Sequence, residues 1–164
     1  VLQYDNCDSL SIADANSYLY SIFDRHFFQI RKSDDYPALL QEMAQQIEES
    51  GYGGEHYAQY VMERESYMST IYMNGVCIPH PIEICANRNL ISVCILEEPI
   101  CYEDKQASII FMVSLTKEDY EVHKDITKKL YQLMNDEKRL QRVLRNRTLE
   151  ELLIVMKELD GGTL

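Results

Sequence analysis

Two apolar runs of strand length constrain the fold of this chain more than any other feature of the sequence. Residues 90–96 and 108–115 are rich in isoleucine and valine, the side chains that favour β-strands. Both runs are much shorter than the roughly 20 apolar residues that a membrane-spanning helix needs. The sequence therefore predicts two strong strands of a sheet and no membrane segment.

Segments with helical spacing lie before and after these runs. Leu40, Met43, Ala44 and Ile47 repeat at i, i+3, i+4 and i+7, which predicts a helix over residues 37–50 that opens on a proline. Further helices are expected over residues 55–67, from Thr116 to about Asn135, from Asp136, and in the last segment, where Thr148 begins a capping-box pattern.

Shorter strand-like segments complete the pattern. Residues 26–31 and 76–78 are predicted as strands, and residues 99–102 as an edge strand, because proline is tolerated at a sheet edge. Helices and strands interleave along the chain. We therefore expect an α/β fold with a mixed β-sheet of about five strands and helices on both faces.

The chain has 164 residues, a length at which one domain is the natural count. Residues 1–24 are polar with scattered aromatics and are predicted to be a linker or N-terminal extension, and residues 25–160 are predicted to form the domain. The first residue is Val1 rather than methionine, which suggests a piece of a longer protein. One short helical face is expected within the extension, formed by Tyr18, Leu19, Ile22 and Phe23.

The charge balance and the cysteines exclude several classes of protein. With 16 basic and 27 acidic side chains, the formal net charge is −11, which argues against a generic nucleic-acid binder. The five cysteines include no CxxC pair, so neither a disulfide framework nor a zinc site is indicated. Reduced thiols and the lack of a signal peptide fit a cytoplasmic location.

One histidine stands out from the other three. His80 lies between Pro79 and Pro81, directly after a predicted strand. Proline fixes its own φ and restricts the residue before it, so the backbone of His80 is stiff. Strand ends are where α/β folds place their binding sites. The alternative is an ordinary turn flanked by prolines. His26 and His56 are expected to be structural or solvated.

Two further residues join His80 as site candidates. His123 lies on a predicted helix in register with an apolar stripe, and a polar ring there needs a partner. Arg64 ends the helix before the loop that leads to His80, and a guanidinium is a natural partner for phosphate. The alternatives are a core histidine and a surface ion pair between Arg64 and Glu63 or Glu65.

These residues belong to a longer motif. It runs as Arg64-Glu65, Ser69-Thr70, Asn74-Gly75-Val76-Cys77-Ile78-Pro79-His80. In this respect the chain resembles the enzyme IIA domains of the bacterial sugar phosphotransferase system, mannitol/fructose type. The resemblance covers about residues 25–159, because the order of predicted strands and helices and the helix that carries His123 are similar too.

The resemblance implies the role of each site residue. It makes His80 the phosphorylated histidine, with Nε2 as the reacting nitrogen. It makes His123 the second active-site histidine and Arg64 the contact of the phosphoryl group. It further implies a phosphate-binding loop, formed by Ser69, Thr70, Asn74 and Gly75. No metal or other cofactor is implied, and no cluster with metal-ligand spacing suggests one.

The sequence departs from the family pattern at two places. Ile71-Tyr72-Met73 stands where the family has a small, glycine-rich loop. Pro81 follows the histidine where many transporter IIA proteins have glycine, and this is similar to the IIA-like domains at the C-terminus of antiterminator-family transcriptional regulators. The resemblance therefore favours a sensor domain of such a regulator.

Three functions remain open on the sequence. The first is a sensor domain that the histidine-containing phosphocarrier protein phosphorylates, with other domains of the same regulator as partners. The second is a transporter component, a phosphohistidine phosphotransferase that passes phosphate to a IIB domain. The third is an interaction domain without phosphoryl transfer. In each case this segment needs no direct nucleic-acid or membrane contact, and neither the sugar nor the oligomeric state follows from the sequence.

Overall fold

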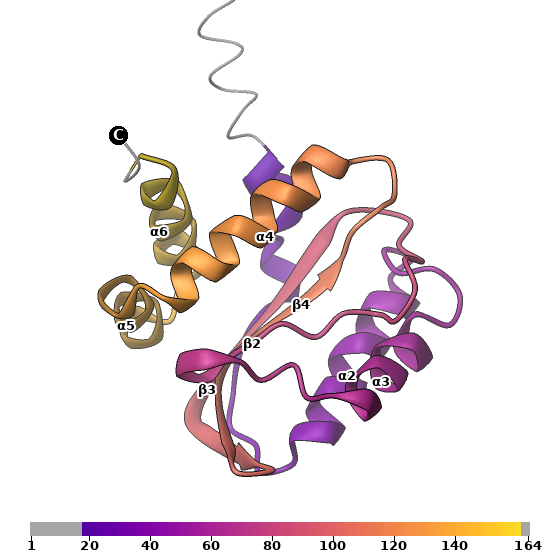
Figure 1. Cartoon of the computed structure of the whole chain (residues 1–164), viewed down its shortest axis with the longest axis horizontal. Helices are drawn as coiled ribbons and strands as arrows, with labels where there is room; N and C mark the ends of the chain where they lie inside the picture. Colours follow the sequence, from indigo (N-terminus) through magenta and orange to yellow (C-terminus); the bar gives the residue numbers. More distant parts are fainter. Residues whose placement is uncertain (1–17, 162–164) are drawn as a thin grey trace, which may run out of the picture.

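The two apolar runs form the centre of a mixed sheet (Figure 1). The computed structural model describes residues 18–161, and within them the strands form a four-stranded sheet in the order β1-β3-β4-β2. β3 and β4 pair antiparallel, whereas β1 is parallel to β3 and β2 is parallel to β4. The strands are β1 (Phe28–Arg31), β2 (Val76–Cys77), β3 (Leu90–Tyr102) and β4 (Lys105–Ser114).

The α/β class is confirmed, but the expected separate edge strand at residues 99–102 is wrong. These residues continue β3, beyond an irregularity of the β3–β4 register between Ile95 and Ile100. Glu97, Glu98 and Pro99 are exposed at this irregularity. Proline has no backbone N–H to donate to the partner strand. It is tolerated here because the hydrogen-bond ladder is interrupted at this point. One bent strand thus takes the place of two.

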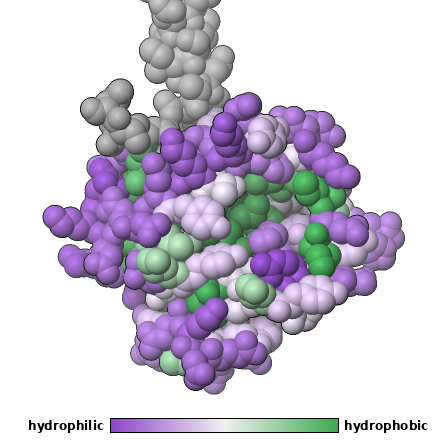
Figure 2. Space-filling model, viewed as in Figure 1, coloured by the Kyte–Doolittle hydropathy of each residue, from purple (hydrophilic) through white to green (hydrophobic). Residues whose placement is uncertain are grey.

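Helices cover both faces of the sheet (Figure 1). α2 and α3 lie on one face, and α4, α5 and α6 lie on the other. Their outward sides are largely hydrophilic (Figure 2). The helices are α2 (Tyr36–Glu49), α3 (Tyr57–Tyr67), α4 (Tyr120–Met134), α5 (Glu137–Asn146) and α6 (Leu149–Gly161), with short 3-10 turns η1 (Arg25–Phe27) and η2 (Met73–Gly75).

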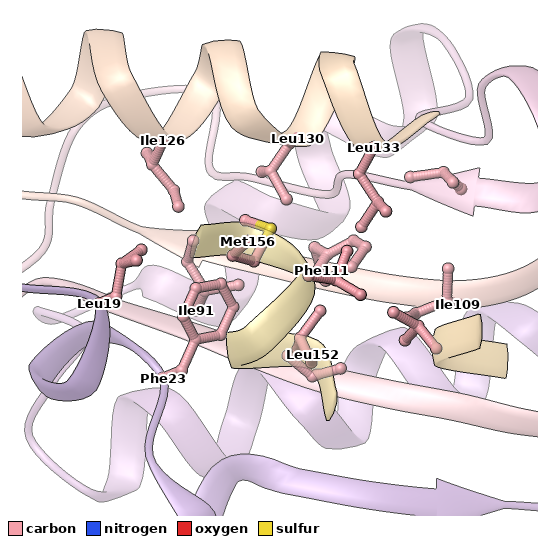
Figure 3. Packing of buried hydrophobic residues seen from close by; sticks show 14 of the residues in the cluster. Leu19, Phe23, Ile91, Ile109, Phe111, Ile126, Leu130, Leu133, Leu152 and Met156 are labelled. Atoms are coloured by element: carbon pink, nitrogen blue, oxygen red, sulfur yellow. The ribbon is translucent and has the colours of Figure 1, made fainter. Parts of the chain in front are cut away.

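The central strands are apolar on both sides because both sides are covered. In β4, Phe111 packs toward α4 and α6, whereas Met112 packs toward α2 and α3. β3 alternates in the same way, with Ile91 on the first side and Leu90 on the second. In Figure 3, side chains of α4 and α6 converge on β3 and β4, among them Ile126, Leu130, Leu133, Leu152 and Met156.

The described part of the predicted N-terminal extension contributes to this core. Residues 18–22 are helical, and Leu19, Ile22 and Phe23 are buried against the α4–α6 side, as the helical face predicted for them requires. The Tyr18 hydroxyl accepts a hydrogen bond from Lys129 of α4 (2.9 Å). The first 17 residues of the predicted extension lie outside the described residues.

The starts of the helices test the predicted caps. Asp136 and Thr148 are confirmed, since their side chains accept hydrogen bonds from the backbone N–H of Arg139 (3.1 Å) and Glu151 (3.2 Å). Thr116 is wrong as the cap of the long helix. α4 begins only at Tyr120, because the backbone N–H of Thr116 donates to the Asn89 side chain (2.8 Å) and residues 116–119 form a turn.

No helix within residues 18–161 is both long and apolar enough to cross a membrane.

Removal of the Asp136 cap should destabilise the protein in a pH-dependent way. Hydrogen bonds from Arg139 hold the pKa of the Asp136 carboxyl below its usual value. The ionised cap therefore stabilises the fold above the ordinary carboxyl pKa of about 4, and this contribution is lost as the pH falls through the lower folded value. Asp136→Ala should cost about 1 kcal/mol at pH 7 and progressively less under acid, as measured by urea unfolding. Gln141→Ala, on the exposed side of α5, is the control, and equal stability of both variants at pH 7 contradicts the prediction.

Candidate functional site

Parallel pairing of β2 with β4 brings two histidines to the same edge of the sheet. His80 follows the end of β2, and His123 lies in the first turn of α4, which follows the end of β4. Both side chains are half-buried and line one pocket of about 250 Å³. Figure 2 shows apolar side chains in the middle of this face, surrounded by hydrophilic ones. The rest of the lining is Tyr72, Ile78, Pro81, Ile84, Val113, Leu115, Ile126, Thr127, Leu130 and Tyr131.

The ring of His80 is oriented by its own backbone. Its Nδ1 lies 3.0 Å from the carbonyl oxygen of Ile78. A carbonyl oxygen only accepts, so Nδ1 carries the proton and donates it. Nε2 of the neutral ring is then left with its lone pair. Such a second hydrogen bond is the usual way in which a protein selects one imidazole tautomer.

Backbone hydrogen bonds fix the segment that carries His80 from both sides. The Ile78 N–H donates to Thr70 (3.0 Å), and the carbonyl of Pro79 accepts from Val113, just inside the end of β4 (2.9 Å). The Ile82 N–H donates to Tyr60 of α3 (3.0 Å). The prolines on either side also have restricted φ angles, so the His80 side chain is attached to a rigid backbone segment.

His123 is oriented through its other nitrogen. Its Nε2 is in short hydrogen-bond contact with the carbonyl oxygen of Thr116, so Nε2 donates and Nδ1 keeps the lone pair. Its backbone N–H donates to the carbonyl of Asp119 at the start of α4 (3.0 Å). The two histidines therefore line the same pocket with opposite ring nitrogens bound to backbone carbonyls, Nδ1 in His80 and Nε2 in His123.

Arg64 lies beside the pocket wall rather than in its lining. It belongs to the last turn of α3, where its Nη1 donates to the carbonyl of Met68 (2.7 Å). The carboxylate of Glu65 accepts hydrogen bonds from Thr70 instead of pairing with Arg64. Burial raises the pKa of the Tyr72 phenol, and the nearby positive charge of Arg64 opposes this rise. Arg64 thus acts electrostatically on Tyr72, which itself lines the pocket with the two histidines.

The residues predicted as a phosphate-binding loop shape a hairpin and do not line the pocket. The Thr70 N–H and hydroxyl both donate to Glu65 (3.0 and 2.6 Å), and the Ser69 hydroxyl accepts from the Ile71 N–H (3.1 Å). Asn74, in the left-handed region at φ 59°, donates to the Met134 carbonyl at the end of α4 (2.8 Å). The hairpin turns at Asn74 and Gly75, and pairing of Tyr72 with Val76 carries the chain on to His80.

Sequence reasoning missed three polar residues of the pocket. Thr127 and Tyr131 follow His123 at i+4 and i+8, a helical spacing that places them on the same side of α4. The sequence marks Tyr72 only as part of a departure from a family pattern, yet in the structure it lines the pocket from the hairpin that precedes β2. Helical spacing from His123 was therefore a usable signal for two of them, whereas Tyr72 carried none.

Other reactive groups give no second centre in the part of the chain that the structure describes. No group of three or more histidine, cysteine or acidic side chains is placed to hold a metal ion among residues 18–161. Cys77 and Cys94 are buried free thiols, and burial raises the pKa of each to about 12. These thiols are small core residues at neutral pH.

Fold and pocket together define a class: an α/β domain with a paired-histidine pocket at one edge of its sheet. A model of the family described as "Phosphoenolpyruvate-dependent sugar phosphotransferase system, EIIA 2" matches residues 21–159, and the chain belongs to this family. The family thus covers nearly all of the described residues.

Two curated relatives are regulators from Bacillus subtilis (strain 168). The "Probable licABCH operon regulator" is 26% identical over 140 residues, which are 84% of this chain and 21% of the relative. The "Transcriptional regulator ManR" is 27% identical over 92 residues, which are 56% of this chain and 14% of the relative. The matched part of this chain thus spans about a fifth or less of each relative.

Solved structures share the fold at low identity. The nitrogen regulatory protein IIA-Ntr from Neisseria meningitidis has a TM-score of 0.71 at 17% identity, covering 83% of this chain and 97% of that chain. Enzyme IIA for mannitol from Escherichia coli, in complex with phosphorylated enzyme IIB, has a TM-score of 0.66 at 18% identity. This match covers 84% of this chain and 99% of that chain. These likenesses confirm the mixed sheet covered on both faces.

Gly75 should be much less tolerant of a side chain than a second glycine with the same backbone conformation. A Cβ at Gly75 (φ +77°) would lie 2.6 Å from Oγ and 2.9 Å from Cβ of Ser108, whereas Gly51 (φ +84°) has open space. Gly51→Ala should cost about 1 kcal/mol for its left-handed backbone alone. Gly75→Ala should cost about 2 to 4 kcal/mol, since the clash adds to that strain. Thermal and urea unfolding measure both, and equal losses contradict the role of the contact.

Proposed function

We propose that this domain accepts a phosphoryl group on Nε2 of His80 from the histidine-containing phosphocarrier protein of the sugar phosphotransferase system. The observation that carries the proposal is the hydrogen bond from His80 Nδ1 to the Ile78 carbonyl, which leaves the Nε2 lone pair for reaction in a pocket shared with His123. Membership of the enzyme IIA family supports the same chemistry.

The transfer balances without a cofactor. The Nε2 lone pair of His80 forms a new bond to phosphorus. The bond between phosphorus and the donor's imidazole nitrogen breaks, and its electron pair stays on that nitrogen. His80 gains PO₃⁻ and loses no proton from Nε2, because the proton of the neutral ring is on Nδ1. Imidazole is a competent nucleophile and leaving group near neutral pH, so the step runs in both directions.

His123 and Arg64 compensate the added negative charge in this proposal. Nδ1 of His123 takes up a proton and donates a hydrogen bond to a phosphoryl oxygen, while Nε2 stays bound to Thr116. Arg64 supplies fixed positive charge from beside Tyr72. Ser69, Thr70, Asn74 and Gly75 contribute by holding the hairpin that positions His80.

The relatives favour a sensory role over a transport role. Both named relatives are regulators, so we propose that the domain reports sugar supply to other domains of a cytoplasmic transcriptional regulator. The net charge of −11 favours encounter with a basic donor surface. The second candidate, transfer to a IIB domain, is suggested by the IIA–IIB complex among the structures of this fold. A chase of the labelled domain with a purified IIB domain separates them: retention of the label supports the sensor, and rapid loss to a IIB cysteine supports the transporter.

Loss of His80 should abolish labelling by the phosphotransferase system. The chain is incubated with phosphoenolpyruvate, enzyme I and the phosphocarrier, and acid-labile phosphate is measured. Wild type should be labelled and His80→Ala should not, because His80 is the pocket histidine whose Nε2 keeps its lone pair, whereas Nε2 of His123 is engaged with Thr116. His56→Ala, an exposed histidine at the start of α3, is the matched control and should label like wild type. Failure of wild type to label would leave only the function of an interaction domain.

His123→Ala should keep the fold and slow the transfer. Removal of a positioned donor to a developing oxyanion charge costs on the order of 100- to 1000-fold in rate. The ring is half-buried at the start of α4, so the melting temperature should change little. Rapid-quench labelling measures the rate, and His26→Ala, in the exposed turn η1, is the control. Wild-type transfer kinetics would make His123 a structural residue only.

A further inference from the structure

The pocket offers few polar groups to a phosphoryl group on His80. A phosphoryl group carries three strong acceptor oxygens, which need donors once they leave water. The hairpin donors of Thr70 and Asn74 are engaged with other partners. Besides His80, the polar side chains that line the pocket are Tyr72, His123, Thr127 and Tyr131.

Among the three hydroxyls, that of Tyr72 is held most firmly. Its backbone N–H donates to Val76 (2.8 Å), so the residue belongs to the same hairpin that leads to His80. Its ring is half-buried and packs against the α4–α6 side of the core. Thr127 and Tyr131 are exposed on α4, where water competes for their hydroxyls.

The surroundings of Tyr72 keep its hydroxyl a donor. Burial raises the pKa of the phenol, so the O–H stays protonated at neutral pH. The positive charge of Arg64 opposes this rise in pKa, which means that it strengthens the O–H as a donor. The Tyr72 hydroxyl is a neutral donor near the Arg64 cation. It can stabilise an oxyanion without placing a charge on the apolar pocket wall.

We propose that the Tyr72 hydroxyl donates a hydrogen bond to the phosphoryl group on His80 and is a phosphoryl-binding residue of this site. The inference rests on the proposed phosphorylation of His80. It gives Tyr72 the task of a donor where the donors of Thr70 and Asn74 are engaged elsewhere, and it explains how Arg64, outside the pocket lining, acts on the bound group.

Tyr72→Phe tests the proposal because it removes only the hydroxyl and keeps the packed ring. Rates of phosphoryl transfer are measured across phosphocarrier concentrations, together with the melting temperature. We expect kcat to fall about 10-fold with KM and melting temperature unchanged, because the lost bond is made only to the phosphoryl group. Tyr102→Phe, a half-buried tyrosine at the end of β3 and outside the pocket lining, is the matched control and should behave as wild type.

Each other outcome overturns the proposal in a recognisable way. A kcat within twofold of wild type shows that the hydroxyl does not contact the phosphoryl group, while labelling that depends on His80 still upholds the proposed function. A raised KM with unchanged kcat places Tyr72 at the donor protein instead. Absence of labelling in wild type removes the proposed function and this inference together.

A second measurement does not depend on the folding of the variant. 3-Fluorotyrosine is placed at residue 72 of the otherwise unchanged chain, and its ¹⁹F resonance is followed as His80 is phosphorylated. The resonance should move clearly, and the resonance of the same probe at residue 102 should not shift. A static resonance at residue 72 overturns the proposal.

Discussion

The parallel pairing of β2 with β4 is the constraint on which the rest of the site depends. β2 is only two residues long, yet its pairing with Ile109 and Ile110 sets the direction in which the chain leaves the sheet. Both strands end at one edge, so their following segments must meet there. His80 and His123 are distant in sequence and become neighbours for this reason alone. The two prolines then hold His80 at that edge.

The turn before α4 shows how the fold and the site share the same hydrogen bonds. Threonine is a favoured N-cap residue, and the sequence predicts Thr116 as the N-cap of the long helix. In the structure its N–H donates to Asn89, and its carbonyl accepts from His123. The carbonyl thus orients a site residue, the N–H is engaged by Asn89, and α4 starts at Tyr120 instead. The hydrogen bonds of the site, rather than the capping preference of threonine, thus decide where α4 begins.

Most of the fold was predictable because short stretches of sequence determine most of its helices and strands. The buried central strands, the helix periods, and the caps at Asp136 and Thr148 follow from nearest-neighbour chemistry. The continuation of β3 past Pro99 was not predictable, because a register irregularity depends on the partner strand. Of the site, His80 was predictable from its place between two prolines at a strand end, and His123 from its register with an apolar helix stripe. The neighbourhood of Tyr72 and the place of Arg64 were not, because both depend on how a hairpin packs against α4.

An apolar pocket is a suitable place for a reaction that adds charge and later removes it. Walls such as Ile84, Val113 and Leu115 solvate a phosphoryl group poorly, so each fixed donor counts for more than it does in water. A wall rich in cations would hold the group too firmly to release it. Burial raises the pKa of the Tyr72 phenol, so this donor is neutral and brings no fixed charge to the pocket. A few neutral donors with one guanidinium behind them therefore favour a phosphoryl group that stays long enough to be read and can still leave.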